Sequence, residues 1–147
     1  MAGNNRVAPP IEHPIVDLGS GNTPTIPWTL FFDSTYRGDQ GTEWSPHFVN
    51  LSSTGTPTIT GRYYQLSGQI AYFRITVTPE TNTSATAGTT YVDNFPLNIS
   101  FDGSCLAMSG NTGSNSGHVV ASTKRIYVPT WTNVTVPVTI TGMVEAG

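Results

Sequence analysis

Residues 134–145 constrain the fold most, because apolar residues alternate there with threonine and other residues at a period of two. The apolar members of this run are Val134, Val136, Val138, Ile140 and Val144. Since successive side chains of a strand point to opposite faces, the pattern predicts one buried face and one threonine-coated face. Pro137 cannot donate a hydrogen bond to a neighbouring strand, which predicts an edge or a bulge there. We therefore expect this strand to close a sheet.

Several other short runs have a strand-like pattern. Residues 58–66 and 69–78 are separated by Ser67 and Gly68, a connection suited to a tight hairpin. One face of the second run carries Ala71, Phe73, Ile75 and Val77. We also predict strands over residues 47–50, 89–92, 98–102, 105–108, 118–121 and 125–128, and exposed loops over residues 79–88 and 109–117. Residues 28–147 should form an all-β, antiparallel β-sandwich of jelly-roll-like type, with a barrel as the alternative.

Residues 1–27 show neither a helical nor an alternating period, and they hold five prolines. Because proline favours extended backbone, we predict an extended attachment arm without regular elements. The residues expected to contact a neighbouring protein are Pro9, Pro10, Ile11, Pro14, Ile15 and Val16. A disordered tail is the alternative, although disordered segments usually carry more charge and fewer apolar anchors.

Charge and cysteine content exclude several classes of function. Only 10% of the 147 residues are charged and the formal net charge is −3, so the basic surface typical of nucleic-acid or anionic-membrane binding is missing. No stretch resembles a membrane span, and residues 1–10 lack a signal-peptide pattern. The single cysteine, Cys105, excludes an intrachain disulfide and is expected to pack as a small apolar residue. We expect assembly in the cytoplasm.

No catalytic, cofactor-binding or metal-binding residue is predicted. His13, His47 and His118 lie far apart, and none has a second ligand at a metal-binding spacing. Residues 113–117 read GSNSG, in which Asn115 occupies the place of the serine that a nucleophile elbow requires. A fold can still bring two carboxylates together for glycoside hydrolysis, so that alternative stays open, although we expect no enzyme.

Aromatic side chains are the remaining candidates for contacts with partners or ligands. Trp28 and Trp131 each lie beside a proline-bearing turn, and we interpret them as core or subunit-interface residues. Tyr63 and Tyr64 are adjacent in one predicted strand, so one of them must point outward. The candidate interface or ligand-contact residues are Trp28, Trp44, Tyr63, Tyr64, Trp131 and Pro137.

Five segments of the chain resemble parts of bacteriophage virion proteins, especially tail fibres and related minor structural proteins. Four of them lie in the predicted domain and read GRYYQLSGQIAYFRITVTP (61–79), GTTYVDNFPL (88–97), GSCLAMSGNTGSNSG (103–117) and RIYVPTWTNVTVPVTITGMVEA (125–146). The fifth, PPIEHPIVDLGSGNTPTIPWTLFF (9–32), is similar to segments that begin phage fibre subunits. Together they cover most of the chain as loose patterns of Gly, Tyr, Trp and Pro.

The resemblance implies a β-sandwich module of an assembled virion, commonly trimeric, without chemistry of its own. A short tail fibre or fibre tip, anchored by its N-terminal arm to other virion proteins and contacting the host surface, is the expected role. Because the chain lacks the long shaft of typical tail fibres, a capsid decoration or cement protein stays open as the alternative. A carbohydrate-binding module that stacks an exposed aromatic ring on a host surface glycan is a further alternative.

Overall fold

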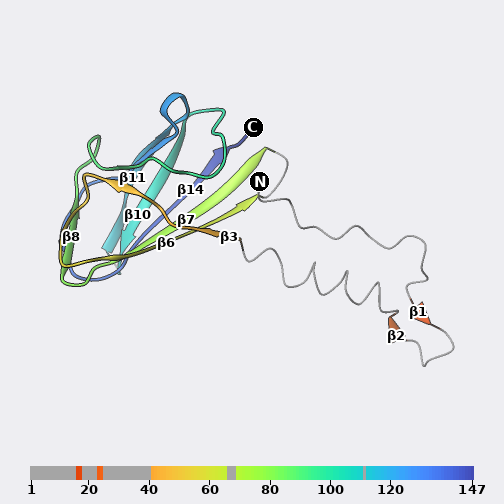
Figure 1. The fold of residues 1–147 in the computed structure, drawn as a ribbon, viewed down its shortest axis with the longest axis horizontal. Helices are drawn as coiled ribbons and strands as arrows, with labels where there is room; N and C mark the ends of the chain where they lie inside the picture. The colour runs from red at the N-terminus through yellow and green to blue at the C-terminus, as the bar shows by residue number, and fades with distance from the viewer. Residues whose placement is uncertain (1–15, 18–22, 25–40, 66–68, 111) are drawn as a thin grey trace. The chain divides into compact units, whose positions relative to one another are not determined.

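The computed structural model describes residues 16–17, 23–24, 41–65, 69–110 and 112–147 (Figure 1). By their contacts, residues 1–42 and 43–147 form two compact units. In the first unit, β1 (Val16–Asp17) pairs with β2 (Thr23–Pro24) in antiparallel fashion. This pair corrects the prediction that residues 1–27 contain no regular element. The predicted domain boundary between residues 27 and 28 lies outside the described residues, as do five of the six predicted arm contacts, with Val16 as the exception.

The second unit consists of short strands and one 3-10 turn, which confirms the predicted all-β antiparallel class. Each strand of this unit belongs to one of two sheets, of nine and three strands. The elements are β3 (Thr42–Trp44), β4 (Phe48–Val49), β5 (Ser52–Thr54), β6 (Thr58–Gln65), β7 (Ile70–Thr78), β8 (Asn82–Ala85), β9 (Tyr91–Val92), β10 (Gly103–Ser109), β11 (Thr112–Val120), η1 (Ala121–Thr123), β12 (Arg125–Tyr127), β13 (Trp131–Val134) and β14 (Val138–Glu145).

The larger sheet is curled into a half-barrel, as its strand order requires. The order is β3-β6-β7-β14-β10-β11-β12-β9-β4, which places β3 and β4 at opposite edges. A flat sheet of nine strands would separate its edges by about 38 Å, at about 4.8 Å per strand. Only residues 45–47 connect β3 to β4, and so short a connection spans at most about 14 Å. The sheet must therefore bend until its two edges approach each other.

The smaller sheet has the order β13-β8-β5 and contributes to the same hydrophobic core. Ala85 of β8 and Trp131 of β13 are buried with the inward residues of the larger sheet. Trp131 also donates a hydrogen bond from its indole Nε1 to Oγ1 of the fully buried Thr83, at 3.2 Å. The core thus lies between the two sheets, as expected of a sandwich.

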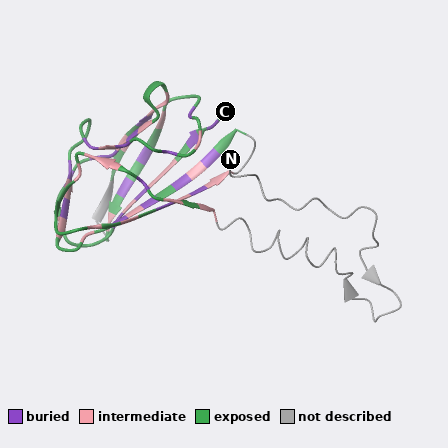
Figure 2. Cartoon of the chain, in the orientation of Figure 1, coloured by how far each residue is buried: buried purple, intermediate pink, exposed green. Residues whose placement is uncertain are grey.

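The hairpin of β6 and β7 follows the predicted residues but differs from the prediction in register. Ala71, Phe73, Ile75 and Val77 are all fully buried, as predicted, and Figure 2 shows buried and less buried residues alternating along β7. A two-residue turn at residues 67 and 68 would pair Tyr63 with Tyr72. Tyr63 instead pairs with Phe73, because the buried faces of both strands must coincide and a one-residue slip would turn one outward.

The C-terminal strand lies at the centre of the larger sheet, which corrects the prediction of a sheet-closing edge strand. β14 pairs with β7 on one side and with β10 on the other. The alternating run is also divided between two strands: β13 ends at Val134 and β14 begins at Val138. Pro137 lies in the connection between them, where no ladder hydrogen bond is needed. Of the predicted buried face, Val138, Ile140 and Val144 are buried as expected. Val134 is only half-buried and Val136 is 44% exposed, because Val136 lies in the connection between the two strands.

Two polar segments that were predicted as exposed loops contain strands. β8 lies within residues 79–88, and its Thr83 and Ala85 are buried. β11 covers most of residues 109–117. Both segments find partners on each side, β8 between β13 and β5 and β11 between β10 and β12, so tertiary pairing outweighs their weak strand propensity. The strand predicted over residues 98–102 does not form. Among the described residues, this segment makes one isolated β-bridge, which joins Ile99 to Ala146.

Aromatic rings fill the core beside β3. Trp44 lies edge-on to Phe95 and Tyr63, with ring centroids 5.5 and 6.0 Å apart. Phe95 in turn contacts Phe73 of β7, at 5.6 Å. Edge-to-face packing of this kind stabilises a core beyond the area that it buries. The cluster therefore holds the β3 edge of the sheet onto the centre of the domain.

Cys105 is buried inside β10, as predicted, with 1% of its surface exposed. Its Sγ lies 3.5 Å from the backbone oxygen of Tyr127. Burial raises the pKa of the Cys105 thiol from 9.0 to about 11, and a backbone hydrogen bond at Gly117 lowers it by a smaller amount. The thiol is therefore protonated near neutral pH.

We expect Cys105 of the folded chain to resist alkylation by iodoacetamide at pH 8, because only about one thiol in a thousand is then ionised. Labelling in denaturant should be at least about tenfold faster, since exposure restores the ordinary thiol pKa. Between pH 9 and 11 the unfolded chain loses this proton first, so stability should fall as the pH rises through that range. Mass spectrometry measures the labelling rates, and equal rates in both states would contradict the prediction.

Candidate binding pocket

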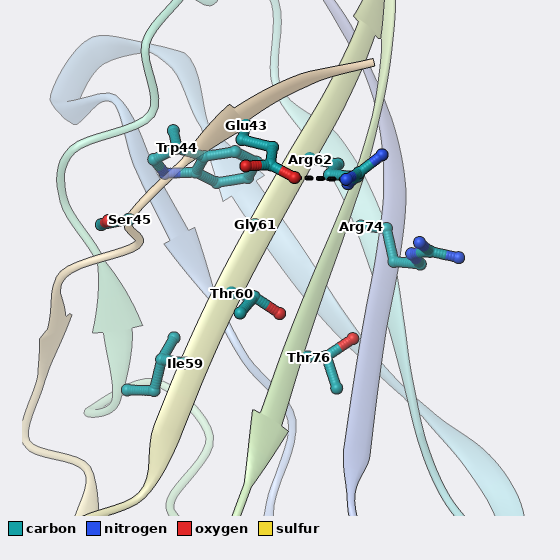
Figure 3. A pocket seen from close by; sticks show the side chains of 9 residues that line it. All are labelled: Glu43, Trp44, Ser45, Ile59, Thr60, Gly61, Arg62, Arg74 and Thr76. Carbon is teal, nitrogen blue, oxygen red and sulfur yellow. Dashed lines mark hydrogen bonds and ion pairs between the residues drawn. The ribbon is translucent and has the colours of Figure 1, made fainter. Parts of the chain in front are cut away.

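A pocket of about 280 Å³ lies where β3 meets β6 and β7 (Figure 3). It combines charged, hydroxyl and apolar side chains from three strands that are neighbours in the sheet. Its lining residues are Glu43, Trp44, Ser45, Ile59, Thr60, Gly61, Arg62, Arg74 and Thr76. The arginines and threonines of this lining lie on the outer face of β6 and β7, whereas Trp44 and Ile59 pack toward the core on the other face.

Gly61 allows the pocket to form. A Cβ atom added there would lie 2.6 Å from Cγ of Pro46 and 2.8 Å from two ring carbons of Trp44. Any larger residue would push Trp44 and Pro46 away from β6, and with them the chain that joins β3 to β4. The indole of Trp44 consequently lies against the backbone of β6. Its Nε1 is buried and has no hydrogen-bond partner within the described part of the chain.

Two cross-strand pairs form the polar side of the pocket. Arg62 is the register partner of Arg74, and Thr60 is the register partner of Thr76. These pairs are adjacent, because residues two apart in a strand point to the same face. Figure 3 shows the two threonines side by side next to the arginines. Two guanidinium groups and two hydroxyl groups are therefore presented together.

The two arginines carry like charges directly opposite each other, an arrangement that costs stability unless it is compensated. Glu43 forms an ion pair with Arg62 through its Oε1 atom. The side chains are 73% exposed for Glu43 and 34% for Arg62, so the pair contributes little to stability. The residues that line the pocket thus include two guanidinium groups and one carboxylate.

The chain as a whole is acidic and has few cations, so two arginines in one place stand out. It contains six Lys and Arg residues, of which Arg6 and Arg37 lie outside the described residues. Two of the remaining four, Arg62 and Arg74, line the same pocket. The arrangement can hold one anionic group by charge-assisted hydrogen bonds and can bind further polar groups through its hydroxyls.

A second surface lies on the outer face of the larger sheet, where one register row is rich in aromatic residues. The row crosses eight strands and consists of Tyr64, Tyr72, Met143, Ser104, His118, Tyr127, Tyr91 and Val49. We call these residues the outer row. Its rings contact one another, with His118 stacked on Tyr127 at 4.8 Å and Tyr127 tilted against Tyr91 at 5.2 Å.

Arg125 covers one end of the outer row. Its guanidinium carbon lies 4.3 Å from the ring centroid of Tyr91, a cation–π contact. It also donates a hydrogen bond to Oη of Tyr127, at 3.4 Å, and this bond raises the pKa of the Arg125 guanidinium. The opposite end has no such cover in the described structure, and Met143 near its middle is 61% exposed.

The predicted contact residues lie in different environments. Trp44 lines the pocket, whereas Tyr63 is buried in the core and Tyr64 belongs to the outer row. Trp131 is also a core residue, with 8% of its surface exposed, and Pro137 is exposed in the connection before β14. Trp28 lies outside the described residues. Among those that the structure describes, only Trp44 and Tyr63 come from different strands and lie in contact, with ring centroids 6.0 Å apart.

Sequence reasoning missed the two arginines, which it treated as ordinary surface charges. Their meeting depends on the register of β6 and β7, and a two-residue turn would have placed Arg62 opposite Phe73. The sequence signal that could have predicted this pairing of the two arginines is the alternation of inward and outward residues along both strands. Because Tyr63 and Phe73 can share the buried face only in an even register, Arg62 and Arg74 must then share the outer face.

Other groupings of reactive residues are sparse. Nδ1 of His47 lies 2.8 Å from Oδ1 of Asp93, at an exposed site. Among the described residues, no three His, Cys, Asp or Glu side chains gather closely enough to hold a metal ion. No helix in the described ranges is long and apolar enough to cross a membrane.

Comparison of the chain with protein-family models, with curated proteins and with solved structures gives no match.

Proposed function

We propose that this chain is a non-enzymatic structural subunit of a bacteriophage particle, of the short tail-fibre type. The N-terminal unit attaches to another virion protein, and the β domain associates with further copies of the chain. The resemblance to fibre proteins motivates the proposal. Its main structural support is the exposed apolar part of the outer face.

This apolar patch consists of Leu106 and Met108 on β10 and Met143 on β14, with exposed fractions of 46, 51 and 61%. The strands are neighbours, and Leu106 and Met108 are the register partners of Thr141 and Thr139. The side chains between the apolar ones are thus uncharged. Apolar patches on the face of a soluble domain, surrounded by small polar residues, mark surfaces that a protein partner covers. A subunit of an assembly has a partner that can cover such a surface.

Met143→Lys is expected to convert an oligomer of the full chain into monomers, because it places a charge in the centre of a contact that excludes water. Sedimentation velocity measures the mass of the assembly. Thr54→Lys is the matched control, since Thr54 is exposed on β5 of the smaller sheet and should leave the mass unchanged. A wild-type chain that stays monomeric at high concentration would contradict this role of the patch.

The place of the subunit in the particle is tested by antibody labelling of intact phage. Labels at the tail are expected. Labels over the capsid lattice would show a decoration protein in place of a fibre, and the absence of the chain from purified particles would overturn the proposal.

A further inference from the structure

We propose that the phenyl ring of Phe101 in one copy of the chain inserts into a hollow on the outer face of a second copy. The hollow lies over β7, β14 and β10. This contact deepens the proposed function and rests on it in one respect, because copies of the chain must associate.

The hollow has a volume of about 440 Å³. Its large side chains are Tyr72, Leu106 and Met143, and the last two belong to the apolar patch. The remaining lining residues are small, namely Gly103, Ser104, Cys105, Thr141 and Gly142. Since about 150 Å³ is enough to hold a benzene ring, the hollow accepts an aromatic side chain together with part of the backbone that carries it.

Phe101 is 63% exposed, the highest fraction among the large apolar side chains that the structure describes. Its ring therefore does not occupy the hollow of its own copy. The backbone on both sides of it is held in place. Ile99 is buried and forms a β-bridge with Ala146, and Oδ1 of Asp102 accepts a hydrogen bond from the N–H of Ala121 at 2.8 Å. An exposed aromatic residue on a fixed backbone loses little conformational freedom on binding, which suits it as an interface anchor.

The charges beside the ring and beside the hollow are opposite. Asp102 follows Phe101 in the sequence and is exposed. Arg74 is exposed on β7, where it is the register partner of Thr141 of the hollow. When the ring occupies the hollow, the carboxylate of one copy lies at the rim near the guanidinium of the other. Such a pair favours one orientation of the two copies over others.

Each copy carries both the ring and the hollow. The same contact is therefore made twice in a two-fold dimer, or repeated around a closed ring of copies. Either arrangement covers Leu106 and Met143, which are exposed in a single copy. A second copy thus accounts for the exposed ring and for the exposed hollow with one contact.

The test is sedimentation velocity of the full chain and of two variants, alone and mixed. Phe101→Ser removes the ring, and Ser104→Glu places a larger, charged side chain in the hollow. Each variant alone is expected to associate at least about tenfold more weakly than the wild type, because every copy lacks one half of the contact. An equimolar mixture should have a higher mean mass than either variant alone, since the intact hollow of the first accepts the intact ring of the second.

Three further variants separate the ring from its charges. Val136→Ser is the matched control for the ring, because Val136 is 44% exposed but lies outside the hollow, and it should leave the mass unchanged. Asp102→Asn keeps the oxygen that accepts from Ala121 and removes only the charge. Asp102→Asn and Arg74→Gln should each weaken association about threefold, and the double variant should be no weaker than either, because the two charges act on each other.

The proposal is overturned if Phe101→Ser keeps the wild-type mass, if the mixture is no heavier than its components, or if the wild-type chain stays monomeric. Lost association in Met143→Lys with unchanged association in Phe101→Ser would show that another group covers the hollow. Labels on the tail with an unaffected Phe101→Ser variant refute the contact alone. A chain that associates through Phe101 but is absent from purified particles refutes the proposed function and leaves the contact intact.

Discussion

Replacing Phe73 with alanine is expected to lower the free energy of unfolding by about 3–5 kcal/mol. Phe73 is fully buried in β7, and its ring contacts Phe95 and lies under Gly142 of β14. A Cβ atom on Gly142 would lie 2.6 Å from Cζ of Phe73, so the ring occupies the space that the glycine leaves. Truncation would therefore leave a cavity that the neighbouring backbone cannot fill.

Urea denaturation of the full chain measures this loss. Tyr72→Ala is the matched control, because Tyr72 precedes Phe73 in the same strand and points to the outer face. It removes an aromatic ring of similar size and should cost about 1 kcal/mol or less. Equal losses in the two variants would show that β7 does not bury one face as described.

Gly117→Ala is expected to cost about 3 kcal/mol, the upper part of the usual range for overpacking. An added Cβ atom would lie 2.2 Å from the backbone oxygen of Tyr127 and 2.8 Å from Sγ of Cys105. These atoms belong to β12 and β10, the strands on either side of Gly117 in β11. The backbone oxygen of Tyr127 cannot move away without disturbing the pairing of β11 with β12. The glycine thus allows the sheet to curl tightly at this point.

Thermal and urea unfolding of Gly117→Ala test this prediction. Ser116→Ala serves as its control, because Ser116 is the exposed neighbour of Gly117 and should change stability by no more than about 0.5 kcal/mol. If Gly117→Ala lowered the free energy of unfolding by no more than Ser116→Ala does, the strands would have room for a side chain at this position.

The local pattern was sufficient for some elements and misleading for others. The alternation of Ala71, Phe73, Ile75 and Val77 predicted both the strand and its buried face, because burial of one face leaves a period of two in the sequence. The polar residues of β8 carry no such pattern. They form a strand because β13 and β5 offer partners on both sides, and pairing between distant segments leaves no local signal.

The candidate pocket shows the same division. Trp44 was predicted as a contact residue from its type alone, and it lines the pocket. Arg62 and Arg74 are twelve positions apart in the sequence and looked like isolated surface charges. They meet only through a register that the sequence near residues 66–68 does not reveal. The partnership of Glu43 with Arg62 depends further on β3 lying beside β6.

By itself the sequence determined the all-β class and the buried faces of the long strands, since both follow from composition and from the period of side chains along a strand. Only the tertiary structure decided strand order, register and curl. Pro137 illustrates the difference. Its missing N–H indicates that this residue does not pair within a ladder, but it does not indicate that β14, which follows it, lies at the centre of the sheet. Position in a sheet depends on which distant strands pair, and that choice is made by the packing of the whole core.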